Sequence, residues 1–145
     1  MAGTDRLNVF AYGSLIFEEV MRAVVGRSFE NHAATLRDHE RRSIEGASYP
    51  GLVEQAGGSV DGRVYLDVDE TSVRILDRFE GEYYERRSVD VAAEQDEVFP
   101  AETYIFRTKW RHLLAEEEWD ADRFERESLR SFLATYKGFS DLDTR

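Results

Sequence analysis

Strand-like runs outnumber helical patterns along this chain of 145 residues. The runs are rich in β-branched and aromatic residues, and they span residues 7–12, 35–43, 62–68, 87–92 and 103–107. Apolar residues recur at helical spacing in three places, residues 17–24, 71–79 and 121–137. The Gly57–Gly58 pair predicts a hairpin turn. Several strands with few, scattered helices predict an α+β domain whose sheet can close on itself.

One domain is expected to span residues 1–145, because no repeat, low-complexity tract or linker interrupts the sequence. Hydrophobic residues make up 41% of the chain, which predicts a packed core. There is no apolar run of about 18 residues, so no membrane span is expected. Residues 1–8 lack the pattern of a signal peptide, and the chain has no cysteine. Both features favour a cytoplasmic location, and the absence of cysteine excludes a thiol nucleophile.

The chain is strongly acidic, with 30 acidic and 19 basic residues and a net charge of −11. Such a chain repels phosphate backbones, so no nucleic-acid partner is expected. The acidity favours a solvated surface that keeps the protein soluble. Nothing in the sequence predicts an oligomeric state.

The turn that follows the first predicted strand is the first candidate for chemistry. It consists of Tyr12, Gly13, Ser14 and Leu15 and leads into the first predicted helix. Backbone N–H groups at a helix start lack internal partners, so they can bind a carboxylate or an oxyanion. Gly13 would let a substrate approach the backbone closely. The alternative interpretation is that Gly-Ser serves only the turn of the backbone.

Glu80 is the second candidate, at the end of the predicted helix over residues 71–79. Partial burial beside Phe79 and Leu76 would raise its pKa, as general acid/base catalysis near neutral pH requires. The alternative is a solvent-facing glutamate with no catalytic role. Glu82 would raise the pKa of Glu80 further if it pointed into a pocket, or it would face water.

Tyr84 and Arg86 form the third candidate. They are two residues apart, so on an extended segment they face the same side. Together they could hold a polar substrate or orient a carboxylate. The alternative is a partly buried tyrosine beside a surface arginine. The three histidines show no metal-ligand spacing, so no metal site and no cofactor are expected.

Four motifs occur in an order that resembles a known family. They are Phe-Ala-Tyr-Gly-Ser-Leu at 10–15, Tyr-Pro-Gly-Leu at 49–52, Gly-Arg-Val-Tyr at 62–65 and Leu-Asp-Arg-Phe-Glu-Gly at 76–81, followed by Tyr84 and Arg86. The set resembles the gamma-glutamyl cyclotransferase-like family, in its AIG2-like or gamma-glutamylamine cyclotransferase branch. The resemblance extends over residues 7–106, and the chain from Lys109 onward carries no signature of the family.

The resemblance implies a small closed mixed β-barrel with flanking helices and a pocket at one end. Residues 12–15 would line this pocket, and Glu80 would be the general acid/base. The α-amine of a small-molecule gamma-glutamyl substrate would attack its own γ-carbonyl, which gives 5-oxoproline and a free amine. The departing group is left open: an amino acid, a lysine side-chain amine or another amine.

Two alternatives stand beside this interpretation. One is a non-catalytic protein of the same fold that binds a small ligand, since fold does not fix function. The other is an interaction protein that uses the acidic C-terminal part, for which an exposed apolar patch on the last helix would be evidence.

Overall fold

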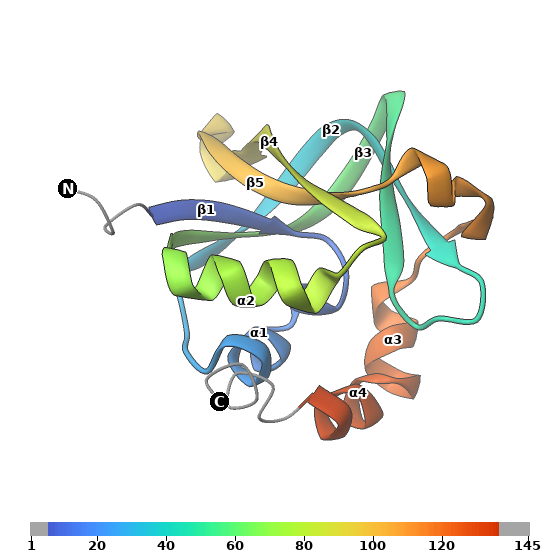
Figure 1. The fold of residues 1–145 in the computed structure, drawn as a ribbon. Helices are drawn as coiled ribbons and strands as arrows, with labels where there is room; N and C mark the ends of the chain where they lie inside the picture. Colours follow the sequence, from blue (N-terminus) through green and yellow to red (C-terminus); the bar gives the residue numbers. More distant parts are fainter. Residues whose placement is uncertain (1–5, 137–145) are drawn as a thin grey trace.

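The computed structural model describes residues 6–136, and its strands form a sheet that closes on itself. The strands are β1 (Arg6–Ala11), β2 (Asn31–Ile44), β3 (Pro50–Asp69), β4 (Tyr84–Ala93), β5 (Val98–Phe106) and β6 (Leu114–Glu118). Their order is β3-β1-β5-β4-β2-β6, and β2 also pairs with β3, which closes a ring of five strands (Figure 1). Because β1 and β5 are parallel and the other pairs antiparallel, the expected α+β fold with a closed mixed sheet is confirmed.

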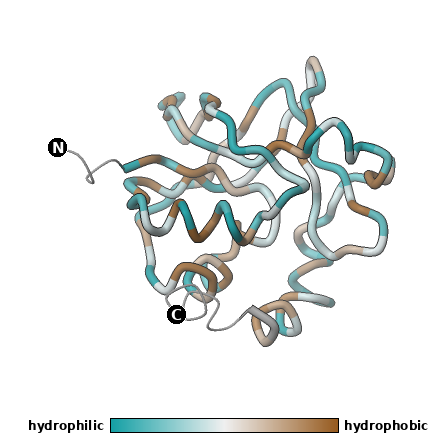
Figure 2. Tube along the Cα trace, viewed as in Figure 1, coloured by the Kyte–Doolittle hydropathy of each residue, from teal (hydrophilic) through white to brown (hydrophobic). Residues whose placement is uncertain are grey.

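The helices flank the sheet. They are α1 (Glu18–Val25), α2 (Glu70–Glu80), α3 (Ala121–Glu127) and α4 (Leu129–Tyr136), with short 3-10 segments at Ser14–Ile16, Glu94–Asp96 and Thr108–Leu113. Helices α1 and α2 cover the same side of the sheet (Figure 1). Hydrophobic and hydrophilic residues alternate along α2 (Figure 2), because one stripe of this helix packs on the sheet and the other faces water.

Strand β1 separates two hydrophobic cores. Val9 and Ala11 belong to the core between the sheet and the helices, whereas Phe10 and Tyr12 belong to the core inside the ring. This division follows from the two-residue period of a strand, which sends alternate side chains to opposite faces. The chain therefore leaves β1 at Tyr12 with one side chain already directed into the ring.

The Gly57–Gly58 pair does not form the hairpin turn that its sequence predicts. Gly57 lies inside the long strand β3 with a φ of +80°, and its N–H donates to the Asp38 carboxylate over 3.0 Å. The register of β2 and β3 shifts here, between Arg37 and His39, so this glycine serves a bulge. The connection between β2 and β3 is made by residues 45–49 instead.

The predicted helix over residues 121–137 is two helices, α3 and α4, which are separated at Ser128. Its predicted last residue, Lys137, lies outside the described residues. In one straight helix Phe124 and Phe132 would be about 12 Å apart along the axis, at 1.5 Å per residue. Their ring centroids are only 5.4 Å apart, so the break folds the two rings against each other.

Within residues 6–136, no helix has the length and apolar character needed to cross a membrane. Among residues 6–134, Val98 on β5 is the one large hydrophobic residue that is exposed. The described part of the last helix therefore lacks the exposed apolar patch that would favour an interaction protein.

Candidate functional site

A cavity lies where the end of β1, the end of α2 and the start of β4 meet. Its volume, taken as the space open to the centre of a water-sized molecule, is about 90 Å³. The residues that line it are Val9, Phe10, Ala11, Tyr12, Gly13, Ser14, Leu15, Tyr49, Pro50, Phe79, Glu80, Tyr83, Tyr84, Tyr104 and Phe132. The structure thus brings the predicted residues 12–15, Glu80 and Tyr84 to one site, although they are far apart in the sequence.

The donor loop, residues 12–15, is held by its carbonyl groups. The carbonyl oxygen of Tyr12 accepts a hydrogen bond from Arg41 over 2.8 Å, and that of Leu15 accepts one from the Tyr65 hydroxyl over 2.6 Å. No acceptor for the N–H groups of Gly13, Ser14 and Leu15 occurs among residues 6–136. Since a trans peptide directs its C=O and N–H to opposite sides, the bond to Arg41 turns the Gly13 N–H away from Arg41. Three backbone donors are therefore available to a ligand.

Gly13 is required by close packing. A Cβ atom at this position would lie 2.8 Å from Cδ of Pro50, so any larger residue would displace the loop or the proline ring. Pro50 itself is fixed, because its carbonyl oxygen accepts a hydrogen bond of 2.7 Å from the buried Tyr84 hydroxyl. The predicted close approach of a substrate to Gly13 is a separate expectation that stays a prediction.

Glu80 is the last residue of α2 and is partly buried against the cavity. The helix ends here because Gly81 adopts a φ of +81°. No hydrogen bond or ion pair reaches the Glu80 carboxyl from any described residue. Burial, and then the charge of Asp77, raises the pKa of Glu80 to about 8. A carboxyl with this pKa can both donate and accept a proton near neutral pH.

Asp77 lies one helical turn before Glu80 and, unlike Glu80, accepts hydrogen bonds from other described residues. Its carboxylate accepts the Tyr104 hydroxyl over 2.6 Å and Nε of Arg86 over 2.9 Å. The same arginine also binds Glu102 over 2.9 Å. Asp77 is thereby held as a fixed negative charge beside the cavity.

Arg86 is the one predicted site residue that does not line the cavity. It turns toward α2 as Tyr84 does, in agreement with their two-residue spacing, but its guanidinium is bound to protein carboxylates. A direct contact between Arg86 and a substrate is therefore not supported by this geometry. Arg86 orients the carboxylate of Asp77, whereas Tyr84 donates to the carbonyl oxygen of Pro50.

The tyrosine hydroxyls of the cavity already have protein acceptors. Tyr12 donates to the carbonyl oxygen of Tyr104 over 2.6 Å, and Tyr84 donates to Pro50. Burial raises the pKa of Tyr12, Tyr84 and Tyr104, so these phenols stay neutral at physiological pH. Their oxygens can accept a hydrogen bond from a ligand, but they are not candidate bases.

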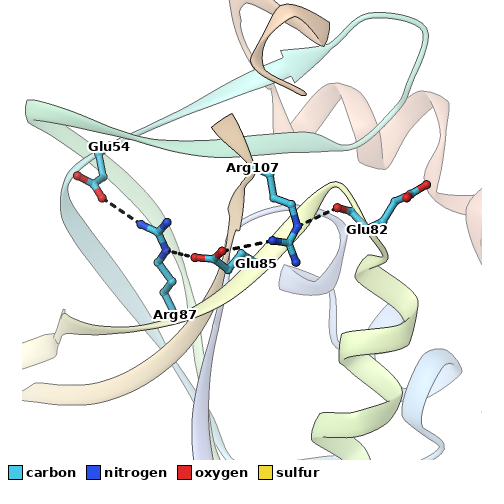
Figure 3. Close-up of polar contacts among 5 residues, drawn as sticks. All are labelled: Glu54, Glu82, Glu85, Arg87 and Arg107. Atoms are coloured by element: carbon cyan, nitrogen blue, oxygen red, sulfur yellow. Dashed lines mark hydrogen bonds and ion pairs between the residues drawn. The ribbon is translucent and has the colours of Figure 1, made fainter. Parts of the chain in front are cut away.

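Glu82 faces water, which is one of the two orientations that the sequence leaves open for it. Its side chain is exposed, and its backbone carbonyl accepts a hydrogen bond of 2.9 Å from Arg107 (Figure 3). This bond fixes the turn that follows Glu80. The contacts continue along the surface from Arg107 through Glu85 and Arg87 to Glu54.

The cavity also contains residues that were not predicted as site residues: Val9, Phe10, Ala11, Tyr49, Pro50, Phe79, Tyr83, Tyr104 and Phe132. Phe79 and Tyr83 could have been suspected, because they flank Glu80 in the sequence. Tyr104 carries no such local signal. It reaches the site because β5 pairs with β4 in a register that sets Tyr104 opposite Arg86.

Comparisons with known proteins identify the family. Its sequence model, described as gamma-glutamyl cyclotransferase, AIG2-like, matches residues 9–121. AIG2-like protein D of Arabidopsis thaliana is 32% identical over 144 residues, 97% of this chain and 94% of the relative. A solution structure of another Arabidopsis thaliana protein has a TM-score of 0.70 at 29% identity, and covers 96% of this chain and 93% of its own. A solved gamma-glutamyl cyclotransferase shares the fold, with a TM-score of 0.63 at 20% identity over 71% of this chain and 68% of its own. The chain therefore belongs to the gamma-glutamyl cyclotransferase family, in its AIG2-like group.

Proposed function

We propose that this protein is a gamma-glutamyl cyclotransferase that converts a gamma-glutamyl amine or amide into 5-oxoproline and a free amine. One observation carries the proposal: the carboxyl of Glu80 and the N–H groups of residues 13–15, which have no hydrogen-bond partner among residues 6–136, border the same cavity. Membership of the family supports the same type of reaction. Glu80 is the general acid/base.

The chemistry is an intramolecular ring closure. The α-nitrogen of the gamma-glutamyl group forms a bond to its own γ-carbonyl carbon, and the bond from that carbon to the departing nitrogen breaks. Since both reacting groups belong to one molecule, the protein needs mainly to fold the substrate into a near-attack shape. The cavity provides this by enclosing the substrate between the donor loop and α2.

The donor loop stabilises the charge that develops during ring closure. As the α-nitrogen attacks, the γ-carbonyl oxygen becomes an oxyanion, which hydrogen-bond donors in fixed positions stabilise. The N–H groups of Gly13, Ser14 and Leu15 serve this oxyanion or the α-carboxylate of the substrate. Their positions are fixed in advance, because Arg41 and Tyr65 hold the carbonyl groups of the loop.

Glu80 carries the protons between the two nitrogens. Its ionised form accepts a proton from the α-ammonium group, and its protonated form then donates to the departing nitrogen. The α-ammonium loses two protons on becoming the lactam N–H, and the departing amine gains the same two when it leaves as an ammonium ion. The reaction therefore consumes no water and needs no redox partner.

The test is to incubate the protein with a panel of gamma-glutamyl amides and to measure 5-oxoproline. Glu80→Gln should lower kcat by about 10²-fold to 10⁴-fold, the usual contribution of a general acid/base. Glu82→Gln is the matched control, because Glu82 is exposed two residues away. A raised melting temperature with these compounds, without any 5-oxoproline, would establish the binding protein instead. Full activity of Glu80→Gln would remove Glu80 from the mechanism.

A further inference from the structure

The cavity is divided into a polar part and an aromatic part. The polar part consists of the donor loop and Glu80. The remaining surface is dominated by an aromatic wall, which comprises Tyr49, Phe79, Tyr83 and Phe132. Among residues 6–136, Glu80 is the one charged side chain that lines the cavity, and no lysine, arginine or histidine of this range does so.

The aromatic wall is built from several elements and is held by ring contacts. The rings of Phe79 and Phe132 meet edge to face with centroids 6.1 Å apart. Tyr83 packs edge to face on Trp110 at 4.9 Å and stacks on Phe106 at 6.1 Å. These contacts fix the rings in place, so the wall presents a preformed apolar surface.

Phe132 comes from outside the region that the family model matches. The match ends at residue 121, whereas Phe132 lies on α4 and is 7% exposed. Its ring also packs on Phe124 of α3, so the break at Ser128 helps to set its position. This part of the wall comes from the C-terminal helices, beyond the residues that the family model matches.

The two parts of the cavity suit the two parts of a gamma-glutamyl amide. The glutamyl part carries an ammonium group, a carboxylate and the reacting carbonyl, and these require the polar part. The departing amine then lies against the aromatic wall. A carboxylate on this amine would lose its hydration there without finding a cationic partner among residues 6–136, which is unfavourable. An apolar ring would instead bury its surface and gain ring contacts.

We infer that the preferred substrates are gamma-glutamyl amides whose departing amine carries an uncharged apolar or aromatic substituent. The inference rests on the proposed cyclotransferase activity and specifies its substrate class. It separates such amides from gamma-glutamyl amino acids and peptides, in which the departing group carries a carboxylate.

Two matched amides test this inference: gamma-glutamyl benzylamide and its 4-carboxybenzyl analogue. With 5-oxoproline as the readout, kcat/KM for the benzylamide should exceed that for the 4-carboxybenzyl analogue by at least about tenfold. Equal or reversed values would overturn the inference and leave the cyclotransferase activity in place. An absence of 5-oxoproline from these amides and from the wider panel would overturn the proposed function itself.

A variant of the wall provides a second test. Phe132→Leu should lower kcat/KM for the benzylamide by about tenfold and leave gamma-glutamyl methylamide unaffected, because a methyl group is too small to reach the wall. Phe99→Leu is the matched control: Phe99 packs in the other hydrophobic core and does not line the cavity. An equal loss on both amides would argue against a specificity role for Phe132. Melting temperatures show whether each variant is folded. If a variant is not folded, the comparison of the amides on the unaltered protein still tests the inference.

Discussion

Replacement of Glu80 by glutamine is expected to stabilise the fold at alkaline pH while it lowers kcat. Burial and the charge of Asp77 raise the pKa of Glu80 from 4.5 to about 8. Between these two values the folded protein keeps a proton that the unfolded chain has released. The free energy of unfolding therefore falls as the pH rises from about 4.5 to 8, and the full cost remains above pH 8. Glutamine has the same shape without the charge, so the variant escapes this cost.

The size of the effect follows from these two pKa values. Linkage gives a penalty of about 1 kcal/mol at pH 5, about 3 kcal/mol at pH 7 and about 5 kcal/mol at pH 9. The cavity opens to solvent, and water there reduces the cost of the charge, so these figures are upper limits. The difference between Glu80→Gln and the parent protein should therefore grow with pH.

Urea unfolding at pH 5, 7 and 9, followed by tryptophan fluorescence, measures this difference. The parent and the variant share all other titrating groups, so their contributions cancel. Glu82→Gln is again the control and should show no comparable growth with pH, since Glu82 is exposed. If the stability of Glu80→Gln relative to the parent is the same at pH 5 and pH 9, the folded protein does not raise the pKa of Glu80, and the reasoning is refuted.

Three further substitutions test the surroundings of Glu80. Asp77→Asn should move the midpoint of the pH profile of kcat/KM to lower pH, because the negative charge of Asp77 raises the pKa of Glu80. Gly13→Ala should lower kcat/KM by about tenfold to 10²-fold in steady-state assays, because the new Cβ would lie 2.8 Å from Pro50 and displace the donor loop. Tyr84→Phe should lower the free energy of unfolding in urea by about 1–3 kcal/mol, because the buried Pro50 carbonyl loses its donor.

Each of these predictions has a clear opposite. An unchanged midpoint in Asp77→Asn would mean that burial alone sets the pKa of Glu80. Unchanged kinetics of Gly13→Ala would show that the loop can move without consequence. Tyr83→Phe is the matched control for Tyr84→Phe, since the Tyr83 hydroxyl makes no hydrogen bond with the described residues. Equal losses in these two variants would contradict a role for the bond to Pro50.

Much of the fold could be predicted because its elements depend on local patterns. The strand over residues 7–12 and the helix that ends before Gly81 follow from hydrophobic period and from the backbone freedom of glycine. Gly57 was misread because a Gly-Gly pair suits a hairpin turn and a bulge equally well. Which of these forms depends on how far β2 and β3 continue, and that is decided by long-range pairing.

The break in the last helix shows a second limit of local patterns. Apolar residues keep helical spacing across Ser128, so the pattern alone predicts one continuous helix. The break brings Phe124 and Phe132 together, and this contact also places Phe132 at the cavity. Packing of side chains from separate elements therefore overrides the local preference, and the aromatic wall could not be foreseen from the sequence.

The candidate site contains two kinds of residue: those that face the cavity and those that act through other residues. Glu80 and the donor loop could be named from short motifs, because each motif carries its own chemistry. The partner of Arg86 could not be named, because Asp77 reaches it by the docking of α2 and Glu102 by the register of β5. Arg86 influences Glu80 through the fixed charge of Asp77. Its removal should therefore alter the pH dependence of the reaction more than the affinity for the substrate.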